Sequence, residues 1–152
     1  MAESGPDDGE APVIVGMADA AMHMFNAAIQ SLPDLHDPAF SERAGVILVG
    51  LRKLQTWLTE AGTRNRNTSA VIVALSGART CYDDLMARAA GGPGATLGQR
   101  LYTARRRAKL SAQETANGAG LPADLLDGVE AEEQPSEAEA TKIKDLIAAL
   151  GG

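Results

Sequence analysis

Residues 97–136 are the most informative part of this chain for its architecture, and they read LGQRLYTARRRAKLSAQETANGAGLPADLLDGVEAEEQPS. Its apolar spacing predicts a basic amphipathic helix over 96–109, followed by a short helix that begins just after residue 110. A glycine-containing turn at 119–121 then separates this helix from a second short one that ends near residue 130. Two short helices joined by such a turn form a helix-turn-helix.

The same stretch resembles the phage-repressor (Cro/cI, or XRE) helix-turn-helix family. The resemblance covers residues 96–150 and depends on the order and spacing of LGQRL, ARRRAKLS, Glu114 with Ala116, Ala119-Gly120-Leu121, Leu126, Val129-Glu130 and Pro135-Ser136. It implies a lambda-repressor-like domain that binds DNA as a dimer, with a recognition helix whose exposed polar residues contact bases. The half of the chain before residue 96 carries no such resemblance.

The predicted recognition helix departs from the family pattern. Alanine stands at residue 112, where the family opens its preceding helix with a glutamine or a similar polar residue. The exposed positions of the recognition helix carry residues that suit base reading poorly: Pro122, Ala123, Asp124, Asp127 and Gly128. One aspartate can accept a hydrogen bond from cytosine N4, but two without a neighbouring cation repel nearby phosphates. We therefore expect a degenerate recognition helix.

Charge is segregated within this region. The helix over 96–109 has a local charge of +5 and no acid, and we take its cations as candidate phosphate contacts: Arg100, Arg105, Arg106, Arg107 and Lys109. An ordinary solvated face is the alternative interpretation. Residues 110–139 carry eight acids and no lysine or arginine.

Two functions follow from this segregation. The first is a transcriptional regulator that binds DNA through the basic helix. The alternative is a repressor-like fold that has lost base reading and acts as a protein-interaction module, binding a basic partner through its acidic face.

The first half of the chain predicts three amphipathic helices, over residues 12–32, 38–60 and 69–90. In the first of these the predicted inward row includes Met17 and Met24. Residues 61–68 are predicted to form a loop, in which Arg64 and Arg66 are either further phosphate contacts or ordinary solvated side chains.

The predicted fold class is all-α, with three domains. An acidic disordered tail covers 1–11, a three-helix antiparallel unit covers 12–92, and a lambda-repressor-like helix-turn-helix domain covers 93–152. Because three helices with many alanines and glycines bury little surface alone, we expect the N-terminal unit to form a homodimer. A monomer, in which this half merely supports the other, is the alternative.

Composition excludes several classes of protein. The 152 residues have a net charge of −6, so any DNA contact must be local, and one cysteine, Cys81, is expected to be a small core residue. No cationic start with an apolar run and no long apolar span occurs, so we expect a cytoplasmic protein without membrane contact. Walker and dinucleotide-binding motifs are absent, and His23 and His36 lack metal-ligand spacing. We expect no enzyme activity, cofactor or metal site.

Overall fold

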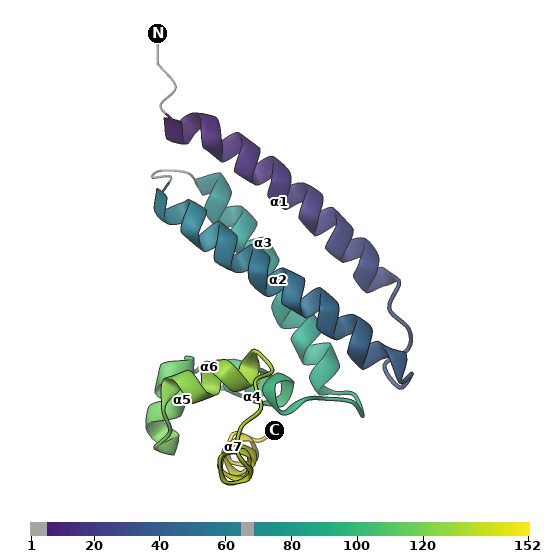
Figure 1. The fold of residues 1–152 in the computed structure, drawn as a ribbon, viewed down its shortest axis with the longest axis vertical. Helices are drawn as coiled ribbons and strands as arrows, with labels where there is room; N and C mark the ends of the chain where they lie inside the picture. Colours follow the sequence, from purple (N-terminus) through teal and green to yellow (C-terminus); the bar gives the residue numbers. More distant parts are fainter. Residues whose placement is uncertain (1–5, 65–68) are drawn as a thin grey trace. The chain divides into compact units, whose positions relative to one another are not determined.

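The computed structural model describes residues 6–64 and 69–152, and these residues contain helices and no strand (Figure 1). The predicted all-α class is therefore confirmed for this part of the chain. In order, the helices are α1 (Pro6–Gln30), α2 (Ala39–Arg64), α3 (Ser69–Ala90), α4 (Leu97–Arg107), α5 (Ala112–Ala119), α6 (Ala123–Glu130) and α7 (Glu137–Ala149).

The chain divides into two compact units. The N-terminal unit takes its described residues from 6–34 and 42–85, and the C-terminal unit consists of 35–41 and 86–152. The first is built from α1, α2 and most of α3, and the second contains α4 to α7.

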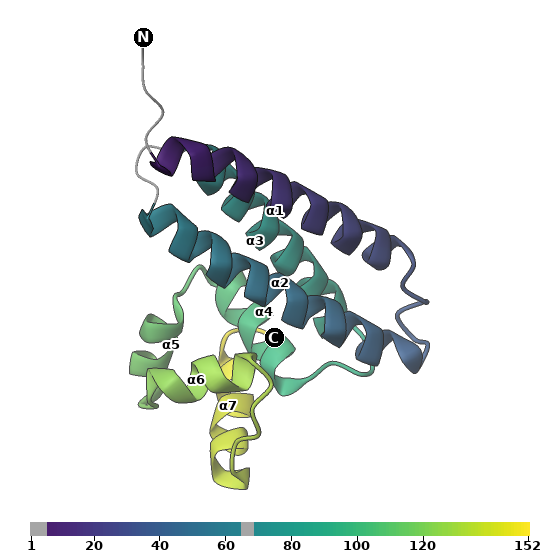
Figure 2. The same ribbon diagram turned by 45° about the horizontal axis from the view of Figure 1, so that its top comes forward.

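The N-terminal unit is held by small and aliphatic side chains from α1, α2 and α3, which lie side by side (Figure 2). Its described core consists of Ala11, Ile14, Ala18, Leu54, Leu58, Ala61, Val71 and Ala78. The regularly spaced apolar residues that make the predicted second helix amphipathic are all buried in α2: Phe40, Ala44, Ile47, Leu48, Leu51, Leu54 and Leu58. A regular three-and-four spacing of large aliphatics makes this face readable from sequence.

Helix α1 differs from the prediction at its start and in its orientation. Residues 6–11, predicted to be disordered, are helical, and Ala11 is buried; residues 1–5 lie outside the described part. A proline at the first helical position sacrifices no intrahelical hydrogen bond, which allows the helix to begin there. Met17 and Met24, predicted inward, are 58% and 71% exposed. Alanines on the buried face let α1 lie close to its neighbours, so this face is preferred over the methionine face.

The predicted loop at 61–68 is wrong in its first half, because α2 continues to Arg64. Ala61 is completely buried in the core, and the Thr63 hydroxyl donates a 2.7 Å hydrogen bond to the Glu60 carbonyl oxygen. A cation in the last turn of a helix is also favourable, which suits Arg64. Arg66 lies outside the described residues.

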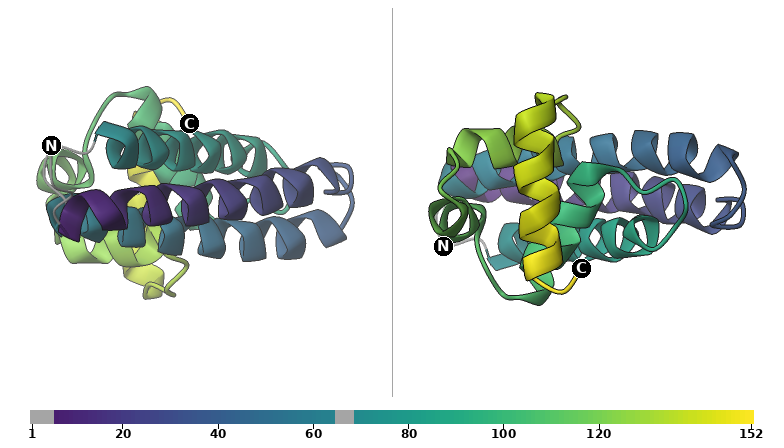
Figure 3. Two further views of the ribbon diagram at one scale, coloured as in Figure 1. Left: turned by 90° about the horizontal axis from the view of Figure 1, so that it is seen from above. Right: turned by 90° about the horizontal axis from the view of Figure 1, so that it is seen from below.

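The C-terminal unit has its own core. Helix α4 packs against α6 and against α7, the yellow helix in Figure 3, while α5 packs against α6. The buried apolar residues are Leu101, Ala104, Ala116, Leu126, Val129, Ile143 and Ile147. Thr115, also buried, donates its hydroxyl to the Ser111 carbonyl oxygen at 2.7 Å, so it carries no unmet hydrogen bond.

Three helices of this unit begin with reciprocal caps. At each start, a hydroxyl accepts from the backbone N–H three residues on, and the Gln or Glu at that position accepts from the cap's own N–H. The pairs are Thr96 with Gln99, Ser111 with Glu114, and Ser136 with Glu139. Thr96 and Ser136 therefore define where α4 and α7 begin. Helix α5 ends at Gly120, whose φ of +68° is the left-handed conformation that favours glycine.

Candidate nucleic-acid interface

Arg105 of α4 and Glu130 of α6 form a buried two-point ion pair. The arginine Nε lies 2.7 Å from Glu130 Oε2, and its Nη2 lies 2.8 Å from Oε1. A third donor, Nη1, contacts the Leu110 carbonyl oxygen at 3.1 Å. Arg105 is 9% exposed and Glu130 is 7% exposed. The prediction of Arg105 as a phosphate contact is therefore wrong, because its guanidinium is committed to joining α4 to α6.

Burial and the contact between the two side chains shift the pKa values of both Arg105 and Glu130. Burial raises the pKa of the Glu130 carboxyl above its ordinary value, although the hydrogen bond and charge of Arg105 act in the opposite direction. Burial by itself lowers the pKa of Arg105, but Glu130 outweighs it, so the pKa of the guanidinium is raised and its charge is retained.

A second contact joins the start of α4 to the residues after α6. The Thr96 hydroxyl donates to Glu132 Oε2 at 2.8 Å while it also caps α4. Glu132 has a φ of +70°, a conformation that non-glycine residues rarely adopt. Together with the Arg105–Glu130 pair, this contact joins the C-terminal end of α6 to α4 at two places, the N-cap of α4 and Arg105.

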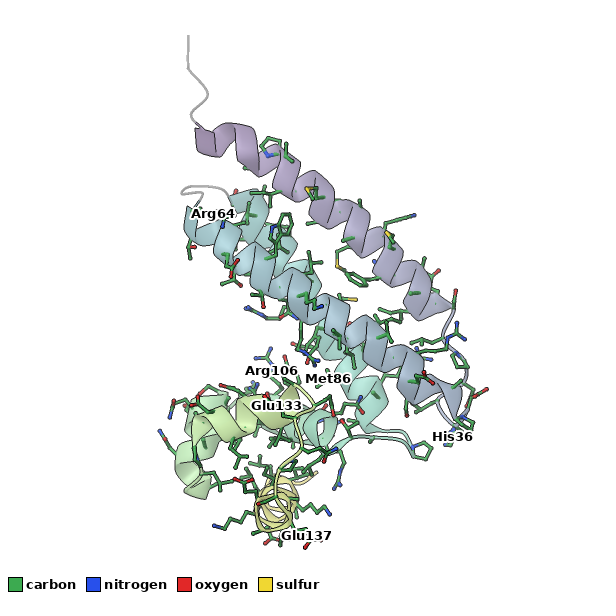
Figure 4. All side chains as sticks on the ribbon, in the orientation of Figure 1. His36, Arg64, Met86, Arg106, Glu133 and Glu137 are labelled. Atoms are coloured by element: carbon green, nitrogen blue, oxygen red, sulfur yellow. The ribbon has the colours of Figure 1, made fainter. Side chains whose placement is uncertain are left out.

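The other predicted cations of α4 are exposed: Arg100, Arg106, Arg107 and Lys109. The Arg106 guanidinium lies 5.9 Å from the centroid of the Tyr102 ring, and that of Arg105 lies 4.8 Å from it. Lys109, just beyond α4, has a φ of +61°. Arg64 is exposed at the end of α2 in the N-terminal unit, where Figure 4 labels it.

Helix α6 presents acids outward, at the positions that the sequence singled out. Pro122 occupies its N-cap without a side-chain hydrogen bond, and Ala123 is half-buried. Asp124 and Asp127 are exposed, as are Glu132 and Glu133 just after the helix. A Cβ added at Gly128 would lie 2.8 Å from the Glu133 carboxylate. The missing side chain at residue 128 therefore lets the Glu133 carboxylate lie close to α6.

Sequence reasoning missed the cap of α5, although the Ser111-x-x-Glu114 pattern carries a recognisable signal. Glu114 Oε1 accepts from the Ser111 backbone N–H at 2.9 Å. That backbone hydrogen bond, helped by the Ser111 hydroxyl, lowers the pKa of the Glu114 carboxyl. A charged Glu114 therefore fits the start of the helix better than a neutral one.

Among the described residues, no group of three or more His, Cys, Asp or Glu side chains could hold a metal ion. Cys81 is half-buried, not fully in the core as predicted, and its Sγ lies 3.8 Å from Asn26 Oδ1. Burial, followed by the charge of Asp84, raises the pKa of its thiol, which makes the reactive thiolate scarcer.

Within α1, residues 11–30 are long and apolar enough to cross a membrane, a property that signal sequences and core helices share.

Comparison with known proteins finds relatives without a described activity. The family model MSMEG_6518_N, described as an N-terminal domain, matches residues 25–96. An uncharacterized protein of Mycolicibacterium smegmatis is 64% identical over 129 residues, which is 85% of this chain and the whole of that protein. No solved structure matches the chain.

Proposed function

This chain, which carries the MSMEG_6518_N domain at residues 25–96, belongs to the same family as the Mycolicibacterium smegmatis protein, and we propose that it is a helix-turn-helix transcriptional regulator of the phage-repressor (XRE) type. In this proposal the N-terminal helices form a three-helix antiparallel dimerisation unit. Helices α4 to α7 form a lambda-repressor-like domain, in which α5 and α6 are the two helices of the motif. The regulator would act in the cytoplasm and need no cofactor.

One observation carries the proposal: α5 and α6 are joined by a short turn at a left-handed glycine, and α6 is fixed on α4 by a buried ion pair. Gly120 ends α5 in the left-handed conformation, and Leu121 donates its backbone N–H to the Ala116 carbonyl oxygen at 3.0 Å. A helix-turn-helix domain that lies against DNA needs a defined arrangement of its helices. The link between Arg105 and Glu130 supplies that arrangement.

In this proposal the DNA is bound mainly through its phosphates. Arg106 and Lys109 lie at the end of α4 that leads into α5, and both are exposed. They can contribute affinity without base information. The exposed Asp124 and Asp127 of α6 disfavour close approach to phosphates, so we assign α6 no general role in base reading.

The proposed homodimer uses the exposed apolar row of α1. Val13, Met17 and Met24 are 61%, 58% and 71% exposed, and their spacing places them on one face of the helix. Asp19 is the only charged residue between positions 11 and 30 of this helix. A face of this kind without lysine or arginine suits a second copy of the chain better than an anionic membrane surface, which attracts cations.

A second function is favoured by the acidic surface after the turn. The exposed acids Asp124, Asp127, Glu132 and Glu133 lie within ten residues. The same domain could therefore bind a basic protein segment through α6 while making no DNA contact. Electrostatic complementarity of this kind steers association and gives specificity.

Titration of duplex DNA into the full-length protein at two salt concentrations tests the first function. Phosphate contacts predict a steep loss of affinity with salt, with a slope near −0.9 for each phosphate neutralised. Replacing Arg106 and Lys109 together by glutamine should lower that slope by about two. The same substitution at Lys142 and Lys144, which are exposed on α7, serves as the matched control. Absence of binding at low salt would remove the DNA-binding function.

The variant Asp124→Asn/Asp127→Asn separates the two functions. If α6 faces DNA, removing both charges strengthens duplex binding. If α6 binds a basic protein, the variant loses affinity for a lysine- and arginine-rich peptide, and duplex binding stays absent.

A further inference from the structure

A small pocket lies beside α4 in the C-terminal unit, with a volume of about 120 Å³. One face of α4 contributes four of its residues, Arg100, Thr103, Ala104 and Arg107; Ile147 of α7 and Gly152 also line it. The spacing of three and four along α4 places these four residues on one side of the helix. Two arginines, a hydroxyl and an apolar floor therefore converge on one hollow.

The hydroxyl in this group lacks a partner. Thr103 is 6% exposed, and its Oγ1 is the buried side-chain polar atom for which the described residues provide no hydrogen bond. Buried hydroxyls are normally satisfied by protein or by ordered water, so an unpaired one marks a place where a molecule in the pocket can supply the partner. Threonine in a helix exchanges between two χ1 rotamers, so a rotation about one bond can turn the hydroxyl towards a molecule in the pocket.

The two arginines that line the pocket are also uncommitted. Within the described part of the chain, the side chains of Arg100 and Arg107 make no hydrogen bond, ion pair or ring contact, whereas the side chain of Arg105 is engaged with Glu130. Arg100 and Arg107 are two helical turns apart, roughly 10 Å along the axis, with Thr103 between them. They lie on the side of α4 nearly opposite the one that Arg105 presents to α6.

We propose that this pocket binds a small tetrahedral oxyanion, such as inorganic phosphate, between the guanidinium groups of Arg100 and Arg107, with the Thr103 hydroxyl as a further donor. Arginine matches the paired oxygens of such an anion, and a hydroxyl donates to a third. The volume of about 120 Å³ is several times the roughly 10–15 Å³ that one water needs by this measure, which leaves room for a free oxyanion.

The ligand of this pocket is a free anion and not the phosphate of a nucleic acid. Its α4 residues lie on the side of the helix nearly opposite the one that carries Arg105 to α6, so a duplex lying along α5 and α6 would face another side of α4. The site therefore does not rest on the proposed DNA binding. It extends the function by giving the domain a small-molecule ligand.

Titration of the ¹⁵N-labelled full-length protein with inorganic phosphate, at constant ionic strength balanced with chloride, tests the site. We expect saturable shifts at the backbone amides of residues 100–107. Arg100→Gln and Arg107→Gln should each weaken binding about tenfold, since each removes a charged hydrogen-bond donor. Thr103→Val, which keeps the shape and removes the hydroxyl, should weaken it roughly fivefold.

Lys109→Gln is the matched control, because it removes one cation near the end of the same helix but outside the pocket. Its phosphate affinity should equal that of the unaltered protein. Thermal unfolding and the amide spectrum of each variant verify that the domain remains folded. Shifts that never saturate, or equal affinity in the protein with both arginines replaced, would overturn the site. Unchanged affinity in Thr103→Val would overturn the assignment of the hydroxyl as a donor.

Discussion

Gly98 of α4 lies directly against the backbone of Val129 in α6. A Cβ at position 98 would overlap the Val129 carbonyl oxygen and would lie 3.1 Å from the Cα of Glu130. Neither neighbour is the flexible end of a side chain, so neither can move aside without shifting a helix. The distance between α4 and α6 is therefore set by the absence of a side chain at residue 98.

Gly98→Ala is expected to destabilise the C-terminal unit by about 1–3 kcal/mol, the usual cost of overpacking a core. Gly118→Ala is its control, because a Cβ at position 118 in α5 meets nothing within 4 Å. That change should stabilise the unit by roughly 0.5–1 kcal/mol through helix propensity. Hydrogen exchange of the α6 amides gives the measurement. Equal protection in the two variants would contradict the close approach.

Arg105→Met is expected to cost about 3–5 kcal/mol, because it leaves the Glu130 carboxylate buried without its partner. Combining it with Glu130→Leu should recover most of that loss, since two packed apolar side chains replace the ion pair. Arg107→Met, on the exposed side of the same helix, should change stability by less than about 0.5 kcal/mol. Chemical denaturation followed by circular dichroism compares the four proteins. A loss in the double variant equal to that in Arg105→Met would refute this account.

Two glutamates of the C-terminal unit should titrate on opposite sides of the ordinary glutamate pKa of 4.5. The pKa of Glu114 is lowered in the folded protein, so its stabilisation is present above the ordinary value and is lost as the pH falls through the folded one. The pKa of Glu130 is raised, so its contribution is greatest below the ordinary value and declines as the pH rises through the folded one. NMR titration of the side-chain carboxyls measures both midpoints. Midpoints in the reverse order would contradict both the burial of Glu130 and the hydrogen bond from Ser111 to Glu114.

Met17→Glu combined with Met24→Glu is expected to convert the proposed homodimer into a monomer, because it places two like charges on each copy of the exposed α1 row. Light scattering on the full-length protein gives the mass. Gln30→Glu, which adds one charge at the exposed end of the same helix, should leave the dimer intact. A monomeric unaltered protein at tens of micromolar would rule out this interface.

The sequence predicts α2 and α3 well because large side chains mark one face of each. Leu51 and Leu58 of α2, and Leu85 of α3, are almost completely buried, as their spacing indicates. In α1 the strongest hydrophobic signal misleads, because Met17 is exposed while the small Ala18 is buried. Hydrophobicity alone does not distinguish a face that packs closely from one that stays outside.

The site was less predictable than the helices, for a reason specific to charge. Three successive arginines, 105–107, look alike in sequence. Because an α-helix has 3.6 residues per turn, each of them points in a different direction around α4. One contacts Glu130, which is 25 residues away in the chain. The pocket at Thr103 brings together α4, α7 and the last glycine, and no local pattern marks that convergence.

The reciprocal caps of α4, α5 and α7 each connect residues only three positions apart. Their starts are consequently encoded locally and do not depend on which partner helix arrives later. As the chain leaves the ribosome, the starts of α4 and α5 can be defined before Glu130 is available to Arg105, whereas the start of α7 follows Glu130 in the chain. The Arg105–Glu130 ion pair then joins α6 to α4, a helix whose start is already defined. The definition of helix starts and the packing of the domain are therefore separate steps.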